Sequence, residues 1–435
     1  MEGNNMQFGE KQITPFPYVS PQKSIIMQIG FVNFNTEERK RVSKLMQLLQ
    51  ESEAIEELGI GRVRDHFSNT LFPGTSTLQH HAKYFAILPS LYYHAAHHGR
   101  KFNSTREVEK YIKEAEIQIT RQLAEHNDGT SKLGITGINT YKEAMSDYTK
   151  YVKYDPTYIY GSGMATYCMI PDTSIYQLIK EISLNDVENP HYKRKLKGDD
   201  NTEDAQELTG ENQPIKTSGV VYDFFNGSTM PLTLSSAEAF FVKKEIVESP
   251  YSKGTLLSFL LEKESLLLSE DVSYYEIAKI LDGLDKDVRD VYEKSVLFSK
   301  LIHLIDWSFN YAYYNSFDNL EQSQNCKLAF EELYEIHKET LRDKDRYESL
   351  FNYIRMKDPL LTDFCEKCYY AIMEQGMESL SHLDVMVTSR EQAVKRERSK
   401  IGNSAYRNVK RGNPGYNEFR WTTVRTMVNE IRNPQ

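Results

Sequence analysis

The sequence predicts a mainly α-helical, multi-helical protein with two domains joined by a polar linker and a basic helical C-terminal tail. Apolar residues recur at the spacing of amphipathic helices, and several of these segments begin with a capping sequence. No alternation of strand and helix patterns indicates an α/β sheet. The 435 residues exceed what one ordinary core organises, and the 40% of apolar residues suffice for a sizeable core.

The first half of the chain is predicted to be a helical domain preceded by an arm. Residues 1–24 are polar and contain proline, which indicates a flexible arm, and residues 25–187 form the N-terminal helical domain. The clearest helix of this domain begins at the capping box formed by Ser104 and Glu107. Behind this box, apolar residues follow at helical spacing: Val108, Ile112, Ala115, Ile119 and Leu123.

A second capping sequence lies within residues 59–89, GIGRVRDHFSNTLFPGTSTLQHHAKYFAILP. Ser76 and Gln79 have the spacing of a capping box, so we expect a helix that starts near Thr77. Pro89 is expected to kink or end that helix, because proline has no backbone N–H to donate. A turn that opens a helix also carries free N–H groups, which attract anions. This turn therefore has two interpretations, a plain helix cap and an anion site.

The same stretch contains the candidate anion-binding residues, which are Arg64, Asp65, Thr75, Ser76 and Lys83. An arginine whose fork is held by a neighbouring aspartate matches the geometry of a phosphate. An adjacent arginine and aspartate also suit a purely structural ion pair. The residues alone leave both interpretations open.

The second half begins after a change in composition. Residues 188–218 lose apolar side chains and gain charges of both signs, which is typical of a disordered linker or a long surface loop. The C-terminal helical domain is predicted to span residues 219–388. Its first helix opens within 234–238, and a long aromatic helix covers residues 291–315.

The tail, residues 389–435, differs in charge from the rest of the chain. It holds 11 Lys and Arg against 4 Asp and Glu, a net charge of +7, and subtracting this from the total of −9 leaves −16 for the body. A helix is expected at residues 418–431. The candidate nucleic-acid-binding residues are Arg396, Lys400, Arg407, Lys410, Arg411, Arg420, Trp421 and Arg425. Cations neutralise phosphates and aromatic rings stack on bases, but a basic tail can equally dock on its own acidic body or on an acidic partner.

Metal and cofactor sites are not predicted. His94, His97 and His98 share one helix face, yet no carboxylate lies at ligand spacing beside them, so surface histidines are favoured. Cys365 and Cys368 form one CxxC pair inside a predicted helix, and a zinc site requires two further ligands.

The setting suggested by the sequence is the cytoplasm. Four cysteines in 435 residues provide no disulfide framework, which favours a reducing compartment. The first 24 residues lack the profile of a signal peptide, and no apolar run approaches the roughly 20 residues that a membrane helix needs. We therefore expect no membrane association.

Several motifs resemble one uncharacterised bacterial family, known only as a domain of unknown function. The motifs are Gly30-Phe-Val-Asn-Phe34, Val63-Arg-Asp65, Leu71-Phe-Pro-Gly-Thr-Ser-Thr77, Gln79 and Ala82-Lys-Tyr-Phe85, with weaker blocks reaching Val424-Arg425. Members of this family are encoded among phage-defence genes, near helicases and phospholipase-D-like nucleases. His80 and His81 are not part of the family pattern, and Gly161 stands where a large aromatic residue is expected. The resemblance implies a setting and carries no catalytic residue.

Three functional hypotheses follow. The first is a non-catalytic component of a bacterial anti-phage defence system that binds DNA, or a helicase or phospholipase-D-like nuclease partner, or both. The second is an enzyme that acts on a nucleotide or DNA end through Arg64, Asp65 and the Thr75–Ser76 turn. The third is a helical scaffold whose tail docks on its own body. The sequence leaves the presence of an activity, the partner of the tail and the oligomeric state open.

Overall fold

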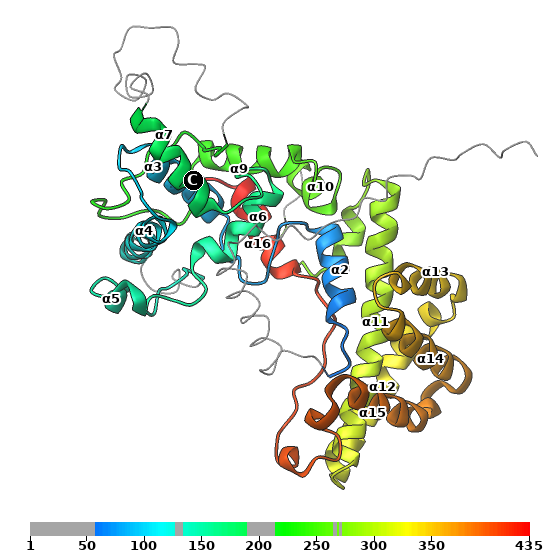
Figure 1. Ribbon diagram of the computed structural model, residues 1–435. Helices are drawn as coiled ribbons and strands as arrows, with labels where there is room; N and C mark the ends of the chain where they lie inside the picture. Colours follow the sequence, from blue (N-terminus) through cyan, green and yellow to red (C-terminus); the bar gives the residue numbers. More distant parts are fainter. Residues whose placement is uncertain (1–56, 127–133, 189–213, 264–267, 269–271) are drawn as a thin grey trace, which may run out of the picture.

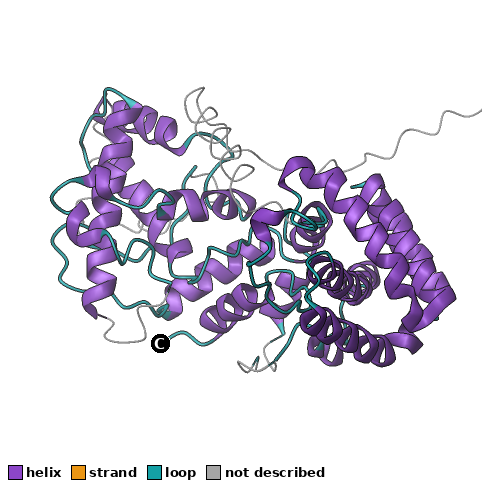
Figure 2. Cartoon of the chain, turned by 90° about the horizontal axis from the view of Figure 1, so that it is seen from below, coloured by secondary structure: helices purple, strands orange, loops and turns teal. Residues whose placement is uncertain are grey.

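The computed structural model describes residues 57–126, 134–188, 214–263, 268 and 272–435 (Figure 1). Throughout these residues the regular structure is helical, and no strand is drawn in Figure 2. The predicted mainly α-helical class is therefore confirmed. The predicted arm, the apolar segment that follows it and most of the polar linker lie outside the described residues.

The first group of helices covers the chain up to the linker. These helices are α2 (Gly61–Leu71), α3 (Tyr84–His97), α4 (Thr105–His126), α5 (Tyr141–Ala144), α6 (Pro156–Thr166) and α7 (Ile175–Glu188). The second group follows the linker and comprises α9 (Ser236–Glu248), α10 (Leu256–Glu262), α11 (Lys286–Asn315), α12 (Leu320–Leu341), α13 (Lys344–Arg355), α14 (Pro359–Gln375), α15 (Leu380–Lys395) and α16 (Trp421–Arg432).

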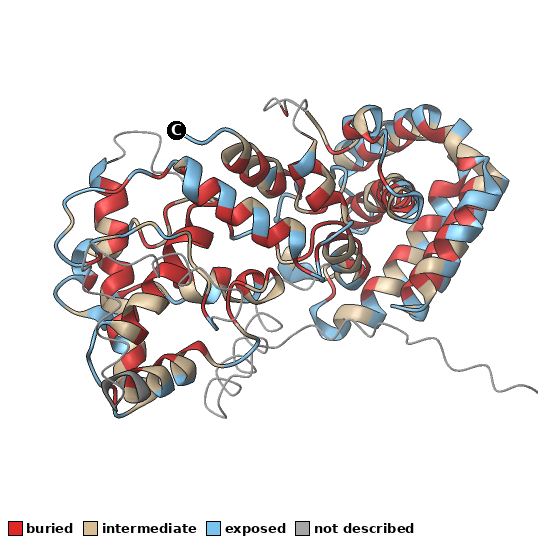
Figure 3. Ribbon diagram, turned by 90° about the horizontal axis from the view of Figure 1, so that it is seen from above, coloured by how far each residue is buried: buried red, intermediate tan, exposed pale blue. Residues whose placement is uncertain are grey.

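The long helix α11 organises the packing of the second group. α12, α13 and α15 pack on it, and α2 from the first group packs on it as well. On the other side of the molecule, α3 contacts α4, α6, α7 and α9, while α16 packs against α9 and α10 (Figure 1). Most helices turn a buried face inward and an exposed face outward (Figure 3). One connected set of buried side chains runs through both groups. The division into two domains stays a prediction.

Two helices, α4 and α9, begin at the capping residues that the sequence predicts. Ser104 Oγ accepts a hydrogen bond from Glu107 N at 3.3 Å, directly before α4. Ser235 and Glu238 form a complete capping box at the start of α9, in which Ser235 N donates to Glu238 Oε2 at 2.7 Å. Each such cap satisfies backbone N–H groups that have no partner within the helix. The predicted starts of α4 and α9 are confirmed.

The helix expected to start near Thr77 is wrong in position, because α3 begins only at Tyr84. Gln79 is the cause. Its side chain is fully buried, and Nε2 donates to Gly74 O at 3.2 Å and to Ile159 O at 3.1 Å. These bonds hold the segment as a turn against α6. α3 also continues past Pro89, which does not end it.

The C-terminal tail folds back across the molecule. Past α15 it makes short 3₁₀ turns, and residues 411–419, here called the strap, then run beside α11 in the opposite direction (Figure 1). Asn310 Nδ2 donates to Gly412 O at 3.0 Å, and Asn417 N donates to Ser299 Oγ at 2.8 Å. The strap leads into α16, so the tail is α-helical only in its first residues, which belong to α15, and in α16.

Candidate functional site

The candidate site is a pocket of about 760 Å³ at the junction of α2, the FPGTST turn (residues 72–77), the strap and α16. The lining is rich in charged, hydroxyl and aromatic side chains. It consists of Arg64, Asp65, Ser68, Ser76, Thr77, His80, His81, Tyr416, Asn417, Glu418, Phe419, Arg420, Trp421, Thr422, Thr423 and Thr426. The pocket therefore joins residues of the family-like N-terminal stretch to residues of the basic tail.

The Arg420 side chain connects the tail to the N-terminal stretch through hydrogen bonds. Its Nη1 donates to Asn69 Oδ1 at 2.8 Å and to Thr75 O at 2.7 Å, and its Nη2 lies 3.4 Å from Asp65 Oδ1. Burial lowers the pKa of Arg420, and Asp65 opposes this shift. Two predicted groups of candidates, one for anions and one for nucleic acid, thus meet at this guanidinium.

The backbone that presents Arg420 has an uncommon conformation. Phe419 and Arg420 have φ angles of +48° and +68°, in the left-handed region that non-glycine residues rarely adopt. Phe419 is buried, and its ring packs 5.6 Å from that of Phe67 on α2. The contacts around this corner thus hold a conformation that costs the isolated chain energy.

The FPGTST turn is held by its own contacts. Gly74 has a φ of +75°, and a Cβ at this position would lie 2.7 Å from the ring of Tyr167. The Tyr167 hydroxyl donates to Pro73 O at 2.9 Å, and the Thr75 hydroxyl donates to Phe72 O at 2.7 Å. Of the two hydroxyl candidates in this turn, Ser76 therefore lines the pocket, whereas the Thr75 hydroxyl is used inside the turn.

His81 lies at the edge of the pocket nearest the C-terminal half of α16. Its Nδ1 is 2.6 Å from Glu430 Oε1, while Glu430 Oε2 accepts a hydrogen bond from Ala82 N at 2.7 Å. Burial and the neighbouring His81 lower the pKa of His80. Neither histidine was predicted as a site residue.

Lys83 lies away from the pocket. Its Nζ is 2.6 Å from Glu238 Oε1 and donates to Thr233 O at 3.0 Å. Burial lowers the pKa of Lys83, and Glu238 opposes that shift. Burial alone would raise the pKa of Glu238, but hydrogen bonds from Lys83, Tyr222 and the Ser235 backbone outweigh it and lower the pKa. Lys83 therefore makes an interior ion pair between the start of α3 and the start of α9.

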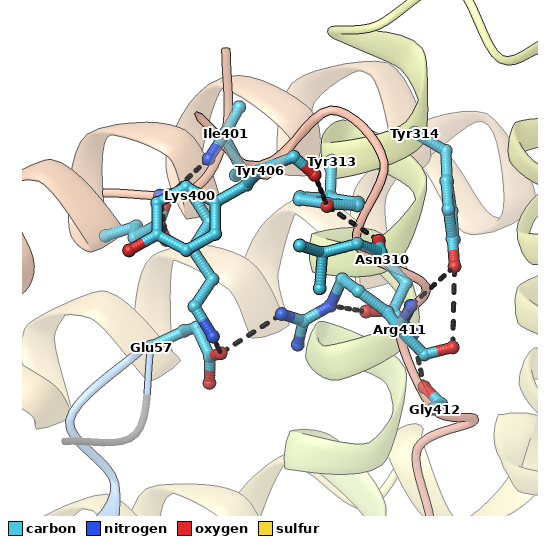
Figure 4. A network of polar contacts seen from close by, with 11 residues as sticks. Glu57, Asn310, Tyr313, Tyr314, Lys400, Ile401, Tyr406, Arg411 and Gly412 are labelled. Atoms are coloured by element: carbon cyan, nitrogen blue, oxygen red, sulfur yellow. Dashed lines mark hydrogen bonds and ion pairs between the residues drawn. The ribbon is translucent and has the colours of Figure 1, made fainter. Parts of the chain in front are cut away.

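Two tail cations share one carboxylate of the body (Figure 4). Lys400 Nζ and Arg411 Nη1 lie 2.9 Å and 3.0 Å from Glu57 Oε1. The Arg411 guanidinium also stacks 4.6 Å from the ring centre of Phe309 on α11. Burial would raise the pKa of Glu57, but the two cations outweigh it and lower the pKa to about 2. These contacts fix the tail to α11 at the start of the strap.

The remaining tail candidates fall into two groups. Trp421 is buried, and its Nε1 donates to Val272 O at 2.8 Å, which Arg425 Nη1 also reaches at 3.1 Å. The other group is exposed and consists of Arg396, Arg407 and Lys410. Long-range contacts therefore separate tail cations that looked equivalent in the sequence.

Several site residues were not predicted from the sequence, namely His80, His81, Tyr416, Glu418 and the three α16 threonines. Among them, only Tyr416 could have been found from the sequence, because it lies among the cations of the tail.

Within the described ranges, no three His, Cys, Asp or Glu side chains gather as ligands of a metal ion would. Of the helices described, none is both long and apolar enough to span a bilayer.

Of three comparisons with known proteins, one finds a match. No curated protein matches the chain, and no solved structure matches it. A model of a family of unknown function, DUF6361, matches residues 26–155. The predicted similarity to an uncharacterised domain is therefore confirmed over the segment that contains α2, the FPGTST turn, α3 and α4.

Proposed function

We propose that this protein is a non-catalytic component of a bacterial anti-phage defence system and binds DNA through the pocket between α2 and the strap. One observation carries the proposal, the convergence of Arg64 from α2 and Arg420 from the tail on a hydroxyl-lined pocket. Guanidinium groups pair with phosphate oxygens through fixed forks of donors. The defence setting comes from the family resemblance.

The pocket also contains two carboxylates, Asp65 and Glu418. Asp65 lies 3.4 Å from the Arg420 guanidinium and limits its rotation. Glu418 accepts a hydrogen bond from the Thr422 hydroxyl at 2.8 Å. An arginine held in one orientation loses less entropy when a phosphate arrives, so it binds more tightly than a mobile one.

Exposed cations of the tail provide a second, weaker contact with DNA. Arg396, Arg407 and Lys410 lie on the segment between α15 and the strap. Such cations add sequence-independent phosphate contacts. A helicase or phospholipase-D-like nuclease partner remains part of the proposal, and a pull-down from the native host tests it.

Fluorescence anisotropy with labelled DNA tests the role of the pocket. Arg64→Ala is expected to weaken binding and to reduce the slope of log K against log salt by about 1, the size of one lost phosphate contact. Arg420→Lys keeps the charge but loses the planar fork of donors, so it is expected to weaken binding with little change in the slope. Arg342→Ala, directly after α12, removes an exposed arginine outside the pocket and serves as the control. DNA affinity that is equal in all three variants and the unmodified protein contradicts the proposal.

A second candidate function uses the same pocket for catalysis on a nucleotide or DNA end. The observation that favours it is the presence of Arg64, Asp65 and Ser76 in one lining. Incubation of the pure protein with labelled DNA or nucleotides and divalent metals tests it. The absence of product, together with full protection by Asp65→Ala in cells, would exclude this candidate.

A third candidate is a scaffold whose tail serves only to hold the body together. The shared pairing of Lys400 and Arg411 with Glu57 favours it. Mass photometry and DNA titration distinguish it from the first candidate, because a pure scaffold of this kind shows no DNA affinity.

A further inference from the structure

We infer that the pocket accommodates a single nucleotide unit with an unpaired base, as in single-stranded DNA, with the base against Tyr416 and its phosphate between Arg64 and Arg420. This inference rests on the proposed function and specifies the form of ligand that the pocket accepts. Its basis is the size of the pocket, the position of one aromatic ring and the distribution of polar groups.

Pocket size limits the ligand. A volume of about 760 Å³ lies within the range of small-molecule sites, which hold about 300–1,000 Å³. Duplex DNA is much wider, since its major groove alone measures about 12 Å across. One nucleotide of a duplex would enter only after unpairing and unstacking, which costs free energy that a single strand does not lose.

Tyr416 is the aromatic surface that a base can reach. Of the three aromatic residues that line the pocket, Phe419 and Trp421 are buried, whereas Tyr416 is 36% exposed. Stacking on such a ring is tolerant of sequence because every base has a π-face.

The Tyr416 ring is held by three neighbouring side chains. The ring centre lies 4.4 Å from that of His303 and 5.0 Å from that of Tyr275. The Tyr416 hydroxyl lies 2.8 Å from His337 Nε2. A ring held in this way provides a preorganised stacking platform rather than a mobile surface side chain.

Polar groups of the pocket suit the rest of a nucleotide. Arg64 and Arg420 supply donors for the phosphate, and the hydroxyls of Ser76, Thr77 and Thr423 are available along the lining for phosphate or sugar oxygens. Aromatic ring, hydroxyls and guanidinium groups thus occur together in a space of nucleotide size.

The test compares three probes by anisotropy and competition: a 12-nucleotide oligo(dT), a hairpin-capped duplex of equal length, and the mononucleotide dTMP. The single strand is expected to bind at least about tenfold more tightly than the capped duplex. Tyr416→Ala is expected to remove most of this difference, whereas Tyr416→Phe keeps the ring and preserves it. Thermal melting of both variants shows whether the fold is retained, and Arg342→Ala is the control.

The outcomes separate the inference from the proposed function. Equal or tighter binding of the capped duplex, still weakened by Arg64→Ala, overturns the inference and leaves the proposed function standing. Binding of dTMP alone, lost in Tyr416→Ala, supports the nucleotide pocket and overturns the DNA role. Single-strand preference that persists in a folded Tyr416→Ala variant overturns the inference. No binding of any probe overturns both.

Discussion

Lys83 Nζ lies 2.6 Å from Glu238 Oε1, and the two side chains are only 3% and 1% exposed. This ion pair joins the start of α3 to the start of α9, two helices separated in sequence by the polar linker. Glu238 also completes the capping box of α9. One carboxylate therefore serves both the local start of a helix and its long-range packing.

Substitution of Lys83 by Met is expected to destabilise the protein by about 3–5 kcal/mol, because it leaves the Glu238 carboxylate buried without its cation. Urea unfolding measures the change. Lys279→Met is the matched control, since Lys279 is exposed and lies 4.0 Å from Glu276, and its effect should stay below about 1 kcal/mol. Equal effects of the two substitutions would contradict the structural role of Lys83.

Glu57→Gln is expected to loosen the tail, because it removes the charge that Lys400 and Arg411 share. Amide hydrogen exchange should increase in residues 400–411 while exchange in α4 stays unchanged. Glu339→Gln, which removes an exposed partner of Arg342, is the control and should leave the tail protected. Unchanged exchange in the tail of Glu57→Gln would show that these pairs do not hold it.

Local features of the fold were predictable because they depend on neighbouring residues. The caps at Ser104 and Ser235 place the starts of α4 and α9 correctly. The start of α3 was not predictable in this way. Its capping sequence at Ser76 is overridden by the buried Gln79, whose contact with Ile159 lies 80 residues away.

The candidate site was predictable only in part. Arg64, Asp65 and Ser76 were identified from their place in one short stretch, and Arg420 from the charge of the tail. These residues come together in one pocket because the strap runs back along α11. No short-range pattern in the sequence predicts that path. The same long-range packing directs Trp421 into the core.

The protein is expected to lose stability in acid because of the buried His337. Burial, with Lys300 and His303, lowers its pKa to about 4 from an ordinary value of 6.5. Between these values the unfolded chain binds the proton more readily, so the contribution of His337 to stability is complete above pH 6.5 and is lost as the pH drops toward 4. His337→Gln is expected to flatten this dependence by about 1–2 kcal/mol. Urea unfolding from pH 7 to pH 4 measures it, and an unchanged profile would contradict the prediction.

Gly74→Ala is expected to destabilise the FPGTST turn by about 1–3 kcal/mol, through the positive φ and the close approach to Tyr167. Gly99→Ala is the control for backbone strain alone, because it also has positive φ but no atom within 4 Å of the added Cβ. Thermal unfolding compares the two. A loss no larger than that of Gly99→Ala would show that Tyr167 yields to the methyl group.

The tail cations are predicted to differ in their effect on DNA binding according to their contacts. Replacement of Arg396, Arg407 and Lys410 together by Ala should lower the salt slope by up to about 3 and leave unfolding unchanged, because all three are exposed. Arg411→Ala should instead reduce stability, since it removes the stacking on Phe309 and the pair with Glu57.

A triple substitution of Lys279, Arg342 and Lys344 changes the net charge by the same amount at exposed positions outside the tail. If it lowers the slope as much as the tail triple, the effect comes from total charge. A larger change in the tail variant would instead place the contact on the segment before the strap. Because this segment continues into the pocket through residues 411–419, both contacts would then lie along one continuous stretch of chain.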